Sequence, residues 1–324
     1  MDALWAKHDG PDEWHPLVAH SADVAAVLEM LLRHTRLGLR MARLMGQDTL
    51  SEEQIQRFCA LAALHDAGKA NPWFQNRAFD PEDRSFDPKR TGDHVTPMVN
   101  MLHSEARWNA LSSAMNLDAM YPWFGSQWDT MDWLRVTWSH HGRPVEPEDG
   151  PKNIWPGETL QRLSAVASWA REWYPDAFEK KAPALRSEQV QHLFNGALTL
   201  ADWIGSDTDF FELSPGLTAP SDAIDTARCR AWDALQNLGL ILSRDVDSAL
   251  LNILDGYSPY QIQEDIQALS ASSEGTLTVL ESATGSGKTE GALGRYAHLL
   301  EDGLVDSMYF AVPTRAAAKQ LYKR

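Results

Sequence analysis

The sequence predicts a mainly α fold: a helical bundle over residues 1–245, followed over residues 246–324 by the incomplete beginning of a parallel α/β domain. Apolar residues in the first part recur at intervals of three and four, which is typical of helices that bury one face. Near residue 246 the pattern changes to two short apolar runs that flank a Gly/Ser/Thr-rich loop and a helix, as at the start of a parallel sheet. The segment after this change is too short to complete such a sheet.

The helices of the first part are predicted from their apolar faces and caps. The first spans Val18–Leu44, and the apolar residues of one face are Val24, Val27, Leu28, Leu31 and Leu32. The second follows Ser51, which forms a capping box with Gln54, and we expect it to end near Gly68. Further helices are expected over residues 93–115, 129–141, 157–173, 187–205 and 221–243, with loops over 71–93 and 143–157.

In the second part, strands are predicted over Gly275–Leu280 and Met308–Val312. Between them lie the Gly/Ser/Thr-rich loop of residues 282–289 and a helix over Glu290–Leu300. A further helix is expected over Thr314–Arg324. This order predicts that the loop opens a helix, where backbone amides can bind a phosphate.

The composition is that of a soluble globular protein, with 44% hydrophobic and 23% charged residues. No apolar stretch is long enough to span a membrane and the N-terminus lacks the pattern of a signal peptide, so we expect a cytoplasmic protein without a membrane partner. Cys59 and Cys229 are too few for a disulfide framework or a zinc cluster of their own. The net charge of -16 predicts weak binding to duplex DNA, since such binding depends on Lys and Arg.

A candidate metal site begins with the adjacent pair His65-Asp66, at the end of the second predicted helix. Imidazole and carboxylate are metal ligands, and neighbouring helical residues can bind one ion together while the carboxylate reaches a second. Lys69 lies three residues beyond Asp66, where its ammonium could meet a phosphate oxygen or orient a water. The alternative is a polar helix C-terminus, at which His65 and Lys69 only complement the helix dipole.

Further candidate ligands are spread along the first part. His20 lies early in the first helix, and His140-His141 forms a second adjacent pair at a helix end. Asp202 lies within the apolar sequence Leu-Ala-Asp-Trp-Ile, and a buried carboxylate needs a cation or hydrogen bonds. Each residue alone is more often a packing or capping residue than a ligand. The ordered set His, His-Asp, His, His-His, Asp favours a metal site.

The order His20, His65-Asp66, His103, His140-His141 and Asp202 resembles the HD nuclease domain of the CRISPR-associated nuclease–helicase of type I systems. Other segments also resemble this family: the N-terminal Leu-Trp-Ala-Lys, His15-Pro-Leu through His20, and Trp73-Phe74-Gln75 after His65-Asp-Ala-Gly-Lys69. The similarity covers essentially the whole chain. It implies an HD-domain bundle over residues 1–245 and the start of a superfamily 2 helicase domain over 246–324.

The resemblance also implies two metal sites that share one aspartate. One ion would be bound by His20, His65, Asp66 and Asp202, and the other by Asp66, His103, His140 and His141. His94 is an alternative to His103, which we prefer for its helical context and its spacing to His140. Asp66 and Lys69 are the implied catalytic residues. The ions would be divalent transition metals, Fe, Mn, Ni or Co, among which ligand type does not decide.

Residues 282–289, Ser-Ala-Thr-Gly-Ser-Gly-Lys-Thr, resemble a Walker A phosphate loop. The expected nucleotide-binding residues are Gly285, Ser286, Gly287, Lys288 and Thr289. Ser in place of Gly at the first position points to the helicase version of the loop, and Gln261 or Gln263 could contact adenine. The alternative is a Gly-rich turn without a ligand. No Walker B motif follows, so we expect ATP and Mg²⁺ to bind, as in a full-length protein, without hydrolysis by this chain.

Together these features predict a metal-dependent single-stranded DNA nuclease of CRISPR antiviral defence, recruited in full-length relatives to an RNA-guided surveillance complex (Cascade). Trp73, Phe74 and Trp138 lie near proposed ligands and could stack on unpaired bases. Two alternatives stay open: an HD phosphohydrolase of small nucleotides, and a non-catalytic fragment that docks on the surveillance complex. The helicase segment argues against the first and the full ligand set against the second.

Overall fold

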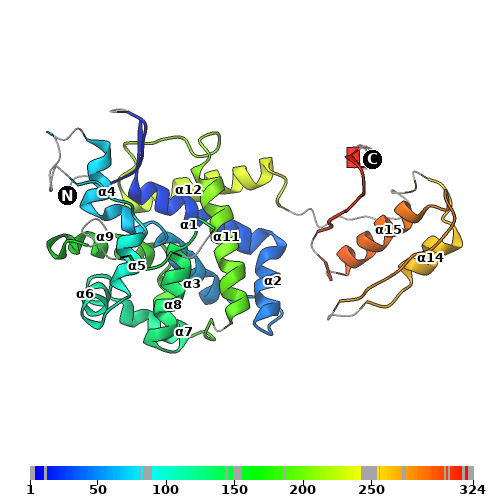
Figure 1. Cartoon of the computed structure of the whole chain (residues 1–324), viewed down its shortest axis with the longest axis horizontal. Helices are drawn as coiled ribbons and strands as arrows, with labels where there is room; N and C mark the ends of the chain where they lie inside the picture. The colour runs from blue at the N-terminus through cyan, green and yellow to red at the C-terminus, as the bar shows by residue number, and fades with distance from the viewer. Residues whose placement is uncertain are drawn as a thin grey trace. The chain divides into compact units, whose positions relative to one another are not determined.

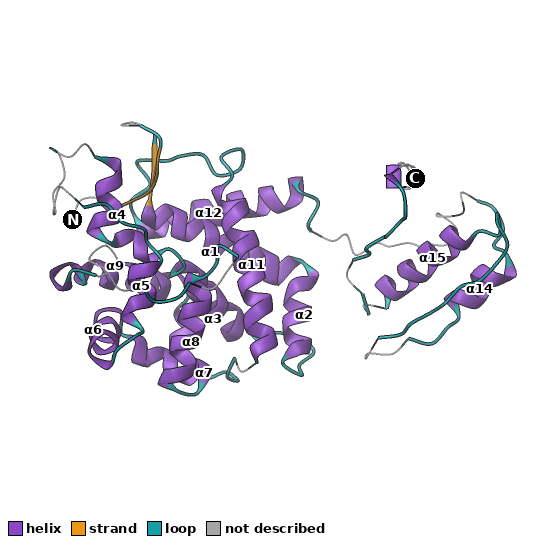
Figure 2. Ribbon diagram, in the orientation of Figure 1, coloured by secondary structure: helices purple, strands orange, loops and turns teal. Residues whose placement is uncertain are grey.

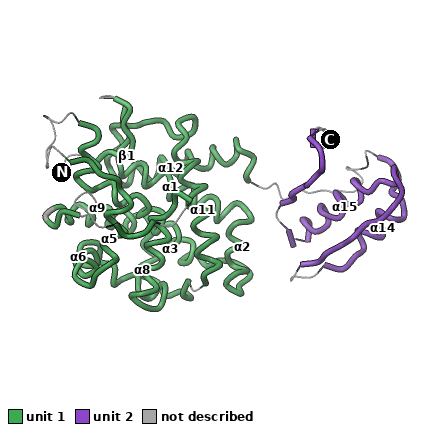
Figure 3. The backbone as a smooth tube through the Cα atoms, in the orientation of Figure 1, with its two compact units in different colours: residues 1–242 green, residues 243–324 purple. Residues whose placement is uncertain are grey.

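The structure, a computed structural model, describes residues 4–10, 13–79, 82, 90–142, 145–148, 155–185, 187–241, 254, 256–271, 275–302, 304–305, 307–315 and 318–319. The chain divides into two compact units, Met1–Leu242 and Ser243–Arg324, coloured separately in Figure 3. Within the described residues, none of the helices combines the length and the apolar character that a membrane span requires.

Unit 1 is a bundle of helices with one short pair of strands (Figures 1 and 2), so the prediction of a mainly α fold is confirmed. Its longer helices are α1 Leu17–His34, α2 Arg36–Leu44, α3 Glu52–Ala63, α6 Glu105–Met115, α8 Gln127–Trp138, α9 Gln161–Trp173, α11 Glu188–Ser206 and α12 Pro220–Asn237. The shorter ones are α4 Pro72–Gln75, α5 Thr96–Met101, α7 Tyr121–Phe124 and α10 Pro175–Glu179, with 3-10 turns η1 Ala67–Ala70, η2 Asn76–Ala78, η3 Leu117–Met120 and η4 Gly157–Thr159.

Helix α1 forms the centre of unit 1, where it packs against α3, α11 and α12. It is buried over almost its whole length because apolar and alanine residues occupy every face, not one stripe. The single helix predicted over Val18–Leu44 is broken at Thr35. The Thr35 hydroxyl donates to the Leu31 carbonyl at 2.6 Å and accepts from the Leu37 amide at 3.1 Å, so the residue ends α1 and caps α2.

Helix α3 begins as predicted but ends earlier. The Ser51 hydroxyl accepts from the Gln54 amide, and the Gln54 side chain accepts from the Ser51 amide, which confirms the capping box. The helix stops at Ala63, five residues before Gly68, and the chain continues into the 3-10 turn η1. An α-carbon substituent on Gly68 would lie 1.7 Å from the carbonyl oxygen of His94, so only glycine permits this close approach of two backbones.

The other elements predicted for unit 1 are mostly helices in the structure as well, but they begin and end at different residues. The helix expected over residues 93–115 is two helices, α5 and α6, because Ser104 adopts an extended conformation and its hydroxyl caps α6 at the Arg107 amide. The loop expected over residues 71–93 contains α4, which begins at Pro72 after Asn71 accepts a hydrogen bond from the Trp73 amide. Local caps therefore decided these boundaries.

Strands β1, Trp5–His8, and β2, Trp14–Pro16, form an antiparallel pair at the start of α1. Lys7 lies opposite His15, and an irregularity in register separates Lys7 from Trp5. The pair was not predicted, since its two runs are shorter than a periodicity of two can reveal.

Unit 2 contains α14, Gln261–Gln267, packed against α15, Lys288–Glu301. The strands predicted over Gly275–Leu280 and Met308–Val312 are not strands in the part of unit 2 that the structure describes, although both segments lie within it. Leu277 is 92% exposed and Tyr309 is 93% exposed, because a strand forms only when a neighbour completes its hydrogen bonds and a packed layer covers its side chains. Much of the helix expected over 314–324 lies outside the described residues.

Candidate metal centre

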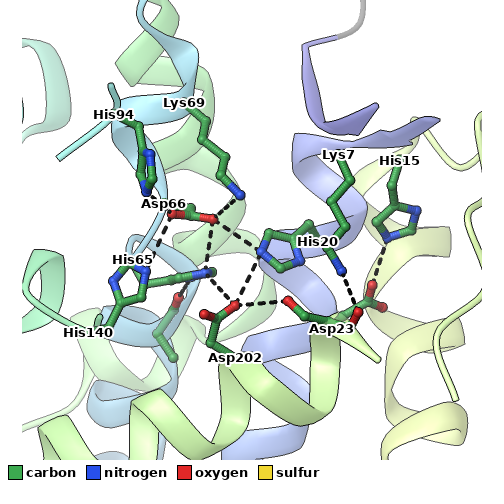
Figure 4. A network of polar contacts seen from close by, with 12 residues as sticks. Lys7, His15, His20, Asp23, His65, Asp66, Lys69, His94, His140 and Asp202 are labelled. Atoms are coloured by element: carbon green, nitrogen blue, oxygen red, sulfur yellow. Dashed lines mark hydrogen bonds and ion pairs between the residues drawn. The ribbon is translucent and has the colours of Figure 1, made fainter. Parts of the chain in front are cut away.

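Five parts of unit 1 bring the candidate ligands to one place (Figure 4). One ligand comes from α1, two from the turn after α3, one from the segment before α5, two from the end of α8 and one from α11; they are His20, His65, Asp66, His94, His140, His141 and Asp202. Four of them, His20, His65, Asp66 and His140, are 1% or 2% exposed. Buried groups of this polarity require partners that compensate for lost hydration.

The first ligand group consists of His20, His65 and Asp202. One side-chain donor atom of each residue lies within 4.8 Å of the other two. The Asp202 Oδ1 atom is 3.6 Å from His20 Nε2 and 3.8 Å from His65 Nε2. Donor atoms at such separations surround a position that a single cation can occupy.

The second ligand group consists of His94, His140 and His141, whose donor atoms satisfy the same 4.8 Å limit. The Nε2 atoms of His94 and His141 are 3.1 Å apart. His103, which we preferred to His94 from the sequence, has an exposed side chain and belongs to no metal-competent group of the described residues. The structure groups His94, and not His103, with His140 and His141. His103 follows the end of α5, whereas His94 precedes α5 and lies against the turn that carries Gly68.

Asp66 lies between the two groups and directs one carboxylate oxygen to each. Its Oδ2 atom is 3.1 Å from His20 Nε2 and 3.3 Å from His65 Nε2. Its Oδ1 atom is 3.2 Å from His94 Nε2 and 3.6 Å from His140 Nε2. The carboxylate is thus oriented as a bridge. The Lys69 ammonium also lies 2.6 Å from Oδ2.

Backbone carbonyls orient two of the imidazoles toward the centre. The His65 Nδ1–H donates to the Ala62 carbonyl at 2.8 Å, and the His140 Nδ1–H donates to the Thr137 carbonyl at 3.1 Å. These bonds leave both Nε2 atoms as acceptors, as in metal-bound histidines. Neither Nε2 atom has a hydrogen-bond partner although both are buried, and the same is true of Asp66 Oδ1. Buried acceptors that converge without donors fit divalent cations.

The electrostatics of the centre favour the protonation states that bind metals. Burial, together with the Lys69 ammonium, lowers the pKa of His20 to about 3. Burial, together with His65, lowers the pKa of His140 to about 3. Burial alone would raise the pKa of Asp66, but Lys69 and His65 outweigh it and hold that pKa well below the usual range. Near neutral pH these imidazoles are neutral and the carboxylate is ionised.

His65 differs from the other histidines. Burial lowers its pKa, but the carboxylate of Asp66 outweighs burial and the net pKa is raised. A proton and a metal ion would compete for its Nε2 atom, since Nδ1 is already engaged with a carbonyl.

The predicted phosphate loop lies at the start of α15, with positive φ angles at Gly285 and Gly287. Lys288 is the first residue of α15 and Thr289 the second. The Lys288 ammonium donates to the carbonyls of Ser282 and Ala283 at 2.8 and 2.7 Å, and Ser286 Oγ is buried without a hydrogen-bond partner. The Gln263 amide donates to the Gly287 carbonyl at 3.1 Å.

The aromatic residues considered for stacking are not available to bases. Trp73, Phe74 and Trp138 are at most 4% exposed. Phe74 stacks on Trp5 with ring centroids 4.6 Å apart, and the Trp138 indole donates to the Leu64 carbonyl. They are core residues that support the ligand-bearing turn.

A family of known proteins matches the part of the chain that carries the candidate ligands. Residues 5–211 match the model of the family described as Cas3, HD domain. The chain belongs to this family. The matched range includes every candidate ligand of both groups.

Two curated relatives are similar over nearly the whole chain. The CRISPR-associated endonuclease/helicase Cas3 of Escherichia coli K12 is 28% identical over 96% of this chain and 37% of its own length. The Thermus thermophilus protein of the same name is 29% identical over 99% of this chain and 35% of its own length. The chain thus spans little more than a third of these relatives.

Solved structures show the same fold at lower identity. A crystal structure of a CRISPR-associated protein superposes with a TM-score of 0.76 at 20% identity, over 99% of this chain and 36% of that chain. A chain in a CRISPR RNA-guided surveillance complex, before nicking, superposes with a TM-score of 0.60 at 22% identity, over 99% and 38%.

Proposed function

We propose that this chain is a metal-dependent nuclease that cleaves single-stranded DNA in CRISPR antiviral defence, and that its HD domain, residues 1–245, binds two divalent transition-metal ions. The first ion would be held by His20, His65, Asp66 and Asp202, and the second by Asp66, His94, His140 and His141. Residues 246–324 would form the N-terminal segment of a RecA-like helicase domain.

The observation that supports two ions most strongly is the orientation of Asp66. One of its oxygens faces His20 and His65, and the other faces His94 and His140. A carboxylate serving one ion would not need both oxygens directed at separate imidazole groups. Two ions so bridged would activate a water and stabilise the leaving oxygen of a phosphodiester.

Lys69 has a separate proposed role. Its side chain is 12% exposed and its ammonium contacts Asp66. Lys69 therefore lies at the edge of the same centre, where a protonated lysine cannot itself bind a metal ion. A lysine in this position can hold a phosphate oxygen of the substrate. Lys69→Ala should therefore keep both ions and slow cleavage on the order of 10²-fold.

The preference for single strands rests on charge. With a net charge of -16 the chain has no general excess of cations for the two phosphate backbones of a duplex. A single strand needs fewer backbone contacts, and the local lysine and the two ions could supply them.

The deciding experiment compares substrates with and without metal. Purified protein, stripped with EDTA and then supplied with Mn²⁺, Co²⁺, Ni²⁺ or Fe²⁺, is incubated with circular single-stranded DNA, relaxed duplex and deoxynucleotides. We expect cleavage of the single strand only, and only with a transition metal. Hydrolysis of deoxynucleotides would favour a nucleotide phosphohydrolase, and no cleavage of any substrate would favour a docking fragment.

His94 and His103 form a matched pair for testing the second ligand group. His94→Ala should lower metal content by about one ion per chain and abolish cleavage, because its Nε2 atom lies 3.1 Å from that of His141. His103→Ala should leave both unchanged, since the side chain is exposed. Elemental analysis and single-turnover rates of both variants provide the measurement. The reverse result would restore His103 as the ligand.

For the phosphate loop we propose nucleotide binding without hydrolysis in a protein consisting of these 324 residues. Gly285, Ser286, Gly287, Lys288 and Thr289 would surround the phosphates of ATP with Mg²⁺. Lys288 now contacts two loop carbonyls and would have to exchange them for phosphate oxygens. Lys288→Ala should leave metal-dependent cleavage unchanged, and DNA-stimulated ATP hydrolysis by the wild-type chain would contradict the proposal.

We also propose that the chain acts with an RNA-guided surveillance complex (Cascade). The similarity to a chain in such a complex and to relatives named CRISPR-associated endonuclease/helicase supports this partner. Pull-down by a DNA-bound surveillance complex from the same host, compared with the DNA-free complex, tests it. Equal capture in both states would oppose recruitment by target binding.

A further inference from the structure

Strand β1 contacts the neighbours of both ligand groups, although it supplies no ligand itself. It carries Trp5 and Lys7 toward α4 and the end of α11, respectively. Figure 4 shows Lys7 beside His20 and Asp23. Residues that contact the neighbours of metal ligands, and not the metal itself, can orient those ligands.

Trp5 is joined to Gln75 by three hydrogen bonds. Its backbone amide donates to Gln75 Oε1 at 3.1 Å, its indole donates to the Gln75 carbonyl at 3.0 Å, and its carbonyl accepts from Gln75 Nε2 at 2.9 Å. The same Gln75 amide donates to the Lys69 carbonyl at 2.6 Å. One glutamine therefore fixes β1 to the turn that carries Lys69.

An aromatic chain continues from Trp5 to a candidate ligand. The Trp5 ring stacks on Phe74 with centroids 4.6 Å apart and an interplanar angle of 27°. Phe74 meets the His94 imidazole edge to face, with centroids 5.4 Å apart and an angle of 74°. This geometry limits rotation of His94, which lies in the segment before α5 and not in a helix.

Lys7 reaches the first group through the end of α11. Its ammonium donates to the carbonyl of Ser206, the last residue of that helix, at 3.1 Å. The Ser206 hydroxyl donates to Asp202 Oδ1 at 3.1 Å, and this oxygen is the atom that faces His20 and His65. A cation at a helix C-terminus is favourable, because the last carbonyls lack intrahelical partners.

From these contacts we propose that β1 positions the ligands of both groups: Trp5 holds His94 through Phe74, and Lys7 holds Asp202 through Ser206. Trp5 and Lys7 are positioning residues, since neither touches a ligand position directly. The inference rests on the proposed two-metal site and adds residues that the proposed ligand set does not include. It also predicts that each residue affects a different ion.

The test measures Mn²⁺ binding by equilibrium dialysis and elemental analysis, independently of cleavage. Trp5→Ala should weaken the second ion and Lys7→Met the first, each by about ten- to a hundredfold, the usual effect of removing an outer-shell partner. Lys7→Arg should restore most of the affinity because it keeps the cation. If Trp5→Ala does not fold, Trp5→Phe, which keeps a ring over Phe74 but lacks the indole N–H, should weaken the same ion by a smaller factor.

Double variants assign each effect to its ion. Trp5→Ala should cost no further affinity when added to His94→Ala, which has already lost the second site, and Lys7→Met should cost nothing further in Asp202→Ala. Trp232→Ala is the matched control, because its indole also packs against one histidine, His34, at 4.9 Å, but touches no ligand group. It should bind both ions as the wild type does.

Failure of the positioning role and failure of the proposed function give different results. If the wild type binds two ions and folded Trp5 and Lys7 variants bind them with unchanged affinity, the positioning role is overturned while the proposed function stands. If the wild type does not bind two ions, the proposed function is overturned and the positioning role with it. A loss of both ions in equal measure in either variant would also overturn the assignment of one residue to one ion.

Discussion

At Gly68, the addition of a single methyl group should weaken binding of the second metal ion more than binding of the first. In Gly68→Ala the added carbon would lie 1.7 Å from the His94 carbonyl oxygen, whereas real contacts of this kind essentially never fall below 3.0 Å. The two backbones must therefore move apart by about 1.3 Å, the difference between these distances. The neighbouring Met98 side chain, 2.9 Å from the added carbon, closes one route of escape.

A displacement of this size is large for a metal ligand. His94 Nε2 now lies 3.2 Å from Asp66 Oδ1 and 3.1 Å from His141 Nε2, and coordination tolerates errors of about 0.2 Å. We expect Gly68→Ala to weaken the second ion by at least about tenfold and to slow cleavage by about 10²-fold. Overpacking should also cost about 1–3 kcal/mol of unfolding free energy. The first ion should be affected less, because its imidazoles, His20 and His65, lie outside the segment that carries His94.

The assay combines Mn²⁺ titration, thermal unfolding and single-turnover cleavage of single-stranded DNA. Gly196→Ala is the matched control, because Gly196 lies inside α11 and nothing is within 4 Å of the added carbon. The free energy of unfolding of this variant should rise by about 0.5–1 kcal/mol. A folded Gly68→Ala protein that binds two ions and cleaves at the wild-type rate would refute the reasoning. So would the selective loss of the first ion.

Two further predictions concern the ligands themselves. Asp66→Ala should lose both ions and all cleavage, whereas Asp202→Ala should lose mainly one ion; full metal content in Asp66→Ala, measured by elemental analysis, would exclude the bridge. In metal-free protein, stability should fall as the pH is lowered from about 6.5 toward 3, because the unfolded chain binds protons at His20 and His140 near pH 6.5 while the folded chain does so only near their pKa of about 3. Each contributes up to about 1.4 kcal/mol per pH unit. His65, whose pKa is raised, changes its contribution only above about pH 6.5 and therefore adds no slope in this range. Thermal unfolding in EDTA across this range is the measurement, and a melting temperature that rises on acidification would contradict it.

The types of the candidate ligands were readable from the sequence because they come in local patterns. The adjacent pairs His65-Asp66 and His140-His141, and an aspartate inside the apolar stretch around Asp202, mark side chains that a helical core does not need. The structure brings these residues together with His20 within hydrogen-bonding or metal-binding distance. The Ser51 cap was equally predictable, since a capping box depends on residues only three apart.

The choice between His94 and His103 could not be made in the same way. Both are single histidines in segments of similar composition, and what separates them is a contact across the chain, between the His94 backbone and Gly68. The positioning proposed for strand β1 could not be predicted for the same reason, because it depends on contacts with Gln75 and Ser206, which lie 70 and 199 residues away from Trp5 and Lys7.

Some elements also failed to form for a tertiary reason. Gly275–Leu280 and Met308–Val312 have the composition of buried strands, yet Leu277 and Tyr309 are exposed. A helix closes its hydrogen bonds within itself, whereas a strand needs a partner, so α14 and α15 persist where the strands do not. Sequence determined the chemistry available to this protein, through residue types and local spacing. Tertiary structure decided which of those residues meet, because distances across the fold depend on packing that local patterns do not contain.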